Sequence, residues 1–124
     1  MKIKNQVTCK ELSQKMCELG FEQEGYYWWR IYNKSNEATL TTDDYCKSNP
    51  KDYTHYVAYT VAEGLEKLPN KIKDSFLRII KMDKGTYVVQ YCYQNMKVDR
   101  EFGDKNLANA VSKMLIWLKE NKYA

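Results

Sequence analysis

The sequence predicts an α+β domain, in which a mostly antiparallel sheet of four to five strands carries helices on one face. Segments with apolar residues at helical spacing occur at about residues 9–19, 61–68 and 105–121. Runs rich in aromatic and β-branched residues lie between them. The whole chain, residues 1–124, is expected to form a single domain, because its length suits one hydrophobic core.

Composition favours a globular protein of the cytoplasm. Hydrophobic residues make up 44% and charged residues 29% of the chain, and the net charge is only +4. The longest uninterrupted apolar run, residues 114–118, is far too short to cross a membrane. No apolar stretch of a secretory signal follows the basic start. The four cysteines, Cys9, Cys17, Cys46 and Cys92, are therefore expected to be free thiols.

Local signals mark the ends of each expected helix. Thr8 and Glu11 have the spacing of a capping box, and Gly20 is suited to end the first helix in the left-handed conformation. Thr60 and Glu63 form a second capping box before the middle helix. Asp104 is placed to cap the last helix, whose apolar residues form a wide stripe.

Strands are expected at residues 26–32, 38–42, 75–82 and 86–93, with a further one at 97–102. The turn at Asp83 to Gly85 makes the third and fourth of these a β-hairpin. Residues 43–54 are rich in Asp, Asn, Ser and Pro, which indicates an irregular loop.

No catalytic or metal-binding pattern stands out. His55 is the only histidine and no two cysteines stand in a C-x-x-C pair, so no familiar zinc spacing is present. Phosphate-binding glycine loops and nucleophile motifs are also missing. We therefore expect neither an enzyme nor a protein with a metal or organic cofactor.

Aromatic content is the unusual feature, with 11 tyrosines and three tryptophans. Strand alternation predicts that Tyr27, Trp29 and Ile31 face the helices, which turns the residues between them outward. The candidate binding residues are Tyr26, Trp28, Arg30 and Tyr32 together with Arg78, Tyr87 and Tyr91 of the hairpin. Three interpretations are open: a sheet face covered by amphipathic tyrosines, a protein interface, or a platform that stacks bases beside arginine.

Three segments carry a resemblance to a known group of proteins. They are Thr8-Cys-Lys-Glu-Leu12 with Leu19-Gly-Phe21, Thr60-Val-Ala-Glu-Gly-Leu65 with Leu68-Pro69, and residues 106–121. Together they resemble small uncharacterised proteins of bacteriophages and prophages of gut bacteria. The motifs are helix caps and helix stripes, so the resemblance implies a shared fold and transfers no site residue.

The resemblance also implies a setting, the cytoplasm of a bacterial host cell. A small phage protein without catalytic motifs is expected to bind, and to inhibit or modulate, a host or defence protein. The alternative is a binder of a nucleotide signal or of single-stranded nucleic acid that uses the aromatic and arginine side chains. No membrane partner is expected, whereas an uncovered aromatic sheet face would suit a homodimer.

Overall fold

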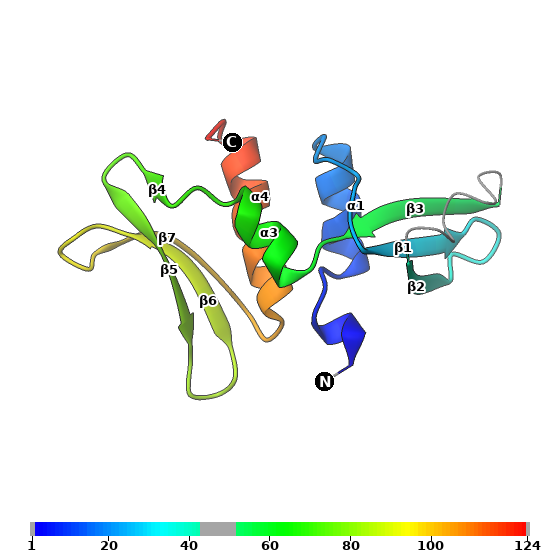
Figure 1. Ribbon diagram of the computed structural model, residues 1–124, viewed down its shortest axis with the longest axis horizontal. Coiled ribbons are helices and arrows are strands. Elements are labelled where there is room, and N and C mark those ends of the chain that lie inside the picture. Colours follow the sequence, from blue (N-terminus) through cyan, green and yellow to red (C-terminus); the bar gives the residue numbers. More distant parts are fainter. Residues whose placement is uncertain (1, 43–51, 124) are drawn as a thin grey trace.

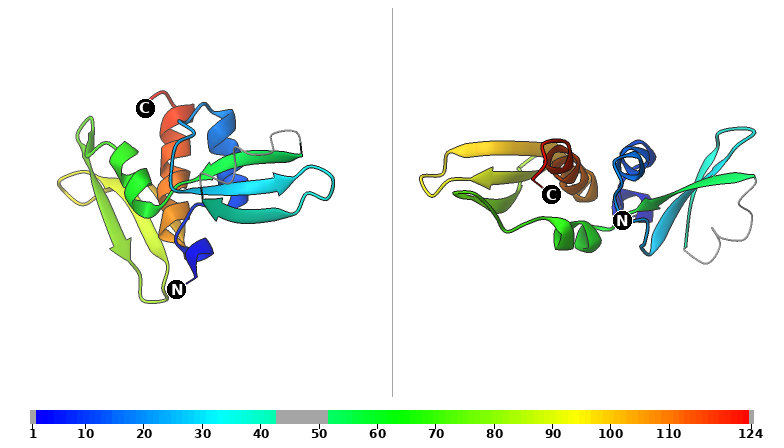
Figure 2. Two further views of the ribbon diagram at one scale, coloured as in Figure 1. Left: turned by 45° about the vertical axis from the view of Figure 1, so that its right-hand side comes forward. Right: turned by 90° about the horizontal axis from the view of Figure 1, so that it is seen from above.

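A computed structural model describes residues 2–42 and 52–123. The elements follow in the order η1 (Ile3–Asn5), α1 (Lys10–Glu18), β1 (Tyr27–Tyr32), β2 (Ala38–Thr42), β3 (Tyr53–Ala58), α3 (Val61–Lys67), β4 (Lys71–Ile72), β5 (Ser75–Lys81), β6 (Tyr87–Cys92), β7 (Val98–Asp104) and α4 (Leu107–Glu120). Figure 1 shows the helices between a group of strands on either side, and both views of Figure 2 agree.

The described strands form two antiparallel sheets, so the expectation of one sheet with helices on one face is wrong. The small sheet has the order β2-β1-β3, and the large sheet has the order β4-β5-β6-β7. α1 packs against β3 of the small sheet, while α4 packs against β6 and β7 of the large sheet. The fold class is nevertheless α+β, as the sequence predicts.

The split into two sheets follows from β3, a strand that the sequence pattern did not predict. β3 pairs with β1 along its whole length, from Tyr27 opposite Ala58 to Tyr32 opposite Tyr53. The chain then passes directly into α3, which packs on α4 and carries the next strands to the far side of that helix. The hairpin of β5 and β6 therefore cannot join the first group of strands.

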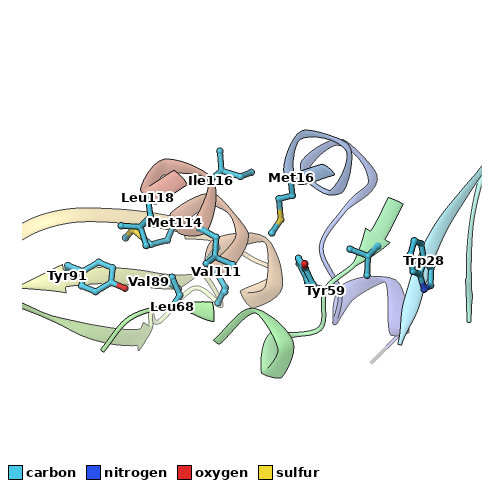
Figure 3. Close-up of a cluster of buried hydrophobic side chains, with 13 residues drawn as sticks. Met16, Trp28, Tyr59, Leu68, Val89, Tyr91, Val111, Met114, Ile116 and Leu118 are labelled. Carbon is cyan, nitrogen blue, oxygen red and sulfur yellow. The ribbon is translucent and has the colours of Figure 1, made fainter. Parts of the chain in front are cut away.

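α4 is the centre of the core. It contacts the large sheet, α3 and α1, and its buried residues extend around the helix instead of following a single stripe. Val111, Met114 and Leu118 are fully buried and pack with Val89 and Tyr91 of the large sheet (Figure 3). None of the described helices is long and apolar enough to cross a bilayer.

The three expected caps have different outcomes. The capping box of α3 is confirmed, with the Glu63 amide donating to the Thr60 hydroxyl and the Thr60 amide donating to the Glu63 carboxylate. At α4 the cap is Asn106, whose side chain accepts from the Ala108 amide, while Asp104 ends β7. At α1 the N-cap is Cys9 and no side chain caps the helix, so the box at Thr8 is wrong.

Thr8 is fully buried and has different partners. Its hydroxyl lies 2.6 Å from the Ser112 hydroxyl of α4 and 3.2 Å from the carbonyl oxygen of Tyr59. The Trp29 indole of β1 donates to the Thr8 carbonyl oxygen over 2.8 Å. Thr8 therefore joins the small sheet, the segment after β3 and the last helix at one point.

We expect Thr8→Val to lower the free energy of unfolding by about 2 kcal/mol, because the buried Ser112 hydroxyl loses its partner. The same change in a Ser112→Ala background should cost clearly less, because that hydroxyl is then absent. Urea denaturation of the four chains of this cycle measures both costs. Two equal costs would contradict the role given to the hydroxyl pair.

Two buried tyrosines make the fold sensitive to alkaline pH. Burial, and then the carboxylates of Glu22 and Glu63, raises the pKa of Tyr59 to about 12. Burial alone raises the pKa of Tyr91 to about 12, and its hydroxyl donates to the Pro69 carbonyl oxygen over 2.7 Å. Tyr59 likewise donates to the Glu22 carbonyl oxygen.

Because both pKa values lie above the value of about 10 in the unfolded chain, the stability they contribute is complete below pH 10. That contribution should be lost as the pH rises from about 10 to 12. We expect the urea midpoint to fall across this window, and to fall less steeply in Tyr91→Phe, which has one ionisable group fewer. Equal slopes for the two proteins between pH 9 and 12 would contradict the assignment.

Candidate binding sites

The candidate residues from the sequence do not form one site. Tyr26 lies just before β1, and Trp28, Arg30 and Tyr32 lie in β1 of the small sheet. Arg78, Tyr87 and Tyr91 belong to the large sheet. The layer of helices separates the two groups (Figure 1).

Two of these rings are core residues. Tyr91 is 1% exposed and packs against α4, and Trp28 is 8% exposed. Figure 3 shows Trp28 of β1 at the far end of the buried cluster. The ring of His55 stands edge-on to the Trp28 ring, with the ring centroids 6.4 Å apart. The Trp28 indole nitrogen has no hydrogen-bond acceptor in the described part of the structure. Neither ring offers a face on which a base could stack.

The small sheet keeps the alternation that the sequence predicts. Trp29 is turned toward α1, since its indole binds Thr8 at the start of that helix. Arg30 lies opposite His55 of β3 and Thr39 of β2, so these three side chains share the other face. Tyr32 lies opposite Tyr53 in the next row of that face. β3 thus contributes two residues, Tyr53 and His55, that the sequence pattern did not place on this face.

Arginine and tyrosine are in direct contact on this surface, which we call the Arg30 face (Arg30, Tyr32, Thr39, Tyr53 and His55). The Arg30 guanidinium lies over the Tyr53 ring, 4.8 Å from its centre. The Tyr53 and Tyr32 rings are 5.3 Å apart and tilted by 49°. Both contacts hold long side chains in place before any partner arrives, which lowers the entropy cost of binding.

A shallow pocket of about 200 Å³ opens on the Arg30 face. It is lined by Arg30, Tyr32, Glu37, Thr39 and Tyr53. Burial, and then the positive charge of Arg30, lowers the pKa of His55, so the imidazole is neutral at pH 7. The pocket therefore combines one guanidinium with one carboxylate and two tyrosines, and carries no excess of positive charge.

A second and larger hollow lies between the two sheets. It has a volume of about 340 Å³ and is lined by Ile3, Asn5, Gln6, Val7, Tyr27, Thr60, Val61, Ala62, Tyr87, Lys105 and Leu107. Its walls come from η1 and the residues after it, from the first residues of β1 and β6, and from the residues that open α3 and α4. Lys105 is the charged residue among them, and the volume is within the range of small-molecule sites.

This hollow could not be found from the sequence, because its walls come from segments far apart in the chain. Tyr27 was expected to face the helices, and Tyr87 was selected only as a ring on the hairpin. The structure brings both rings to the same hollow, next to Lys105.

Metal and thiol chemistry find no support in the described residues. No three His, Cys, Asp or Glu side chains among them are arranged to hold a metal ion. Cys9, Cys17 and Cys92 are free thiols, and burial raises the pKa of Cys9, which makes it a weaker nucleophile. Cys46 and most of the expected loop at 43–54 lie outside the described residues.

No family model, no curated protein and no solved structure matches this chain.

Proposed function

We propose that this protein acts by binding another protein through the Arg30 face of the small sheet. The observation that carries the proposal is the contact of the Arg30 guanidinium with the Tyr53 ring beside a pocket that both residues line. Arginine and tyrosine dominate the energetics of protein interfaces, because both combine a large apolar surface with hydrogen-bonding groups. Here they are already ordered by their mutual contacts.

The shape of the molecule supports this choice. The strands of the small sheet run away from α1, so that their far ends project beyond the helices (Figure 1). Tyr32 and Tyr53 are the residues at those far ends, where β1 ends and β3 begins. A projecting surface of this kind can enter a cleft of a partner protein. The pocket beside it is large enough for a single side chain of that partner.

The charges on this face favour a protein over a nucleic acid. A phosphate backbone is bound by several cations, and its affinity comes from the counterions that they release. The pocket on the Arg30 face instead has Glu37 beside Arg30, and the neutral His55 adds no charge. A protein surface, which offers donors and acceptors of both signs, fits this mixture better.

The setting of the proposal is the one that the sequence resemblance implies. We propose that the protein works in the cytoplasm of a bacterial host cell, as a phage-encoded inhibitor or modulator of a host or defence factor, without catalysis of its own. Binding alone is sufficient for such a role.

Arg30→Ala should weaken the complex by about 30-fold or more, the loss typical of a central interface residue. The partner would first be recovered from a bacterial lysate with the tagged wild-type protein and identified by mass spectrometry. Its purified form would then be titrated against wild type and variants by calorimetry.

Arg100→Ala is the matched control, because Arg100 also lies over an aromatic ring, that of Trp117, at 4.5 Å. It removes the same charge and the same kind of contact from the large sheet, and should leave the affinity unchanged. An equal loss in both variants would show that the Arg30 face has no special role. A partner bound equally well by wild type and Arg30→Ala would overturn the proposal.

A second candidate function uses the hollow between the sheets, and the observation that favours it is the pairing of two tyrosine rings with a cation. Tyr27 and Tyr87 offer surfaces for a flat ring, and Lys105 offers a charge for an anionic group on it. We propose a nucleotide signal as the ligand class, a molecule with one ring system and a phosphate.

If the second function holds, nucleoside monophosphates should raise the melting temperature. A ligand present at 100 times its dissociation constant stabilises the fold by about 2.7 kcal/mol. Ala62→Leu, which fills the hollow, and Lys105→Gln should each reduce the shift, and Lys84→Gln in the distant hairpin turn should not. A shift that persists in Ala62→Leu would place the ligand elsewhere.

A further inference from the structure

The face of the large sheet that points away from α4 carries side chains in three ordered rows. In the middle row Arg78 of β5, Gln90 of β6 and Glu101 of β7 lie opposite one another. In one flanking row Ile80 lies opposite Val88 and Gly103. In the other Phe76 lies opposite Cys92, which pairs with Val98 beyond a register shift between β6 and β7. We call this surface the outer face. Figure 1 shows the helices on the other side of the sheet only.

Large apolar groups are exposed on and beside the outer face. Phe76 is 42% exposed, Val98 41% and Met96 56%. The Lys71 ammonium lies over the Phe76 ring at 5.3 Å, and the Arg78 guanidinium donates to the Met96 sulfur over 3.7 Å. Such a cluster of exposed apolar side chains on a sheet face indicates an interaction surface.

The two charges of the middle row have no ion-pair partner among the described residues of their own chain. The Gln90 amide donates to the Glu101 carboxylate over 2.9 Å, which leaves the negative charge uncompensated. Arg78 and Glu101 lie on either side of β6, about 10 Å apart for two strand spacings. One strand therefore separates a positive charge from a negative charge at the same level of the sheet.

We propose that the outer face binds a second copy of this chain, about a two-fold axis that runs roughly parallel to β6. Such an axis places β5 of each copy over β7 of the other and keeps the level along the strands. Arg78 of one copy then lies over Glu101 of its partner, twice by symmetry. The two sheets face each other about 10 Å apart, as in a β-sandwich.

The flanking rows fit the same axis. Ile80 of one copy lies over Gly103 of the other, where the missing side chain leaves room for it. Phe76 lies over Val98, so the two exposed apolar groups cover each other. The same two-fold axis thus brings complementary side chains together in all three rows. Opposite charges meet in the middle row, Ile80 meets the space at Gly103, and Phe76 meets Val98 in the flanking rows.

The size of the outer face indicates that the dimer is weak. The three strands that overlap, β5, β6 and β7, at about 4.8 Å spacing and about six residues at 3.3 Å, give a footprint of about 300 Å² per copy. The total of about 600 Å² is below the roughly 1,200–2,000 Å² of a standard stable interface. We therefore expect a weak dimer, with a dissociation constant on the order of tens of micromolar.

Sedimentation velocity of the full chain from about 1 to 300 µM tests the proposal. The wild type should shift from monomer to dimer across this range. In high salt the dissociation constant of the dimer should be at least tenfold higher. Arg78→Glu and Glu101→Arg should each be monomeric, because like charges then face each other. Mixed in equal amounts, these two variants should form a heterodimer, because each contact again joins opposite charges.

Two further variants test whether the dimer has this particular arrangement. Lys84→Glu makes the same kind of charge change in the turn before β6, off the outer face, and should dimerise like the wild type. Gly103→Val should weaken the dimer, because it fills the space for Ile80. Within its own chain the added Cβ would have ordinary contacts, the nearest at 3.5 Å from Thr86. Circular dichroism checks that each variant is folded.

A wild type that stays monomeric up to 300 µM would overturn the proposal. So would a dimer that persists in Arg78→Glu, or a mixture of the two charge variants that fails to associate. The test is independent of the Arg30 face, since every substitution lies in the large sheet or its turn.

Discussion

The buried hydroxyl of Thr8 connects parts of the chain that lie far apart in the sequence. It binds the Tyr59 carbonyl oxygen, 51 residues away, and the Ser112 hydroxyl, 104 residues away. Around it, the side-chain amide of Asn106 donates to the Val7 carbonyl oxygen, and the Cys9 backbone amide donates to the side-chain oxygen of Asn109. Polar groups this deeply buried lose several hydrogen bonds to water on folding, so each of them needs its partner. The small sheet and α4 keep their relative positions because this network is complete.

Where the sequence prediction succeeded, the signal was local. The capping box of α3 lies within four residues, and the β5–β6 turn depends on Gly85, whose φ of +81° is the left-handed conformation that glycine favours. The box at Thr8 has the same sequence pattern and failed, because tertiary partners replaced the helix amide. The number of sheets depended on where the chain goes after β3, which no local pattern records.

For the candidate site, too, the sequence predicted the local pattern within one strand and not the contribution of its neighbours. Alternation along β1 correctly grouped Arg30 with Tyr32 and placed Trp29 toward the helices, since period two is a property of any strand. Tyr53 and His55 were missed with the strand that carries them. Trp28 was assigned to the right face but is buried there, against Val57 and beside His55. Burial depends on neighbours from other strands, so the alternation of a single strand could not reveal it.

The two proposed interaction surfaces lie on sheets at opposite sides of the helical layer. They use different chemistry, because the Arg30 face holds its charge beside tyrosine rings whereas the outer face has two separate charges flanked by apolar residues. A dimer through the outer faces would leave both Arg30 faces pointing away from the contact. Such a dimer could hold two partner molecules at once, and a partner that is itself dimeric would bind more tightly, because its second contact would be intramolecular.

The Thr8 network also has a consequence for the order of events on the ribosome. Synthesis proceeds at about 5–20 residues per second, so Ser112 follows Thr8 by about 5–20 s. β1, β2 and β3 can pair during this interval, because all three precede the second half of the chain. Val7 and Thr8, both fully buried in the finished fold, stay exposed to water until α4 emerges. A nascent chain stalled before Ser112 would therefore present the small sheet next to the uncovered Val7 and Thr8. Exposed apolar surface of this kind is what chaperones bind.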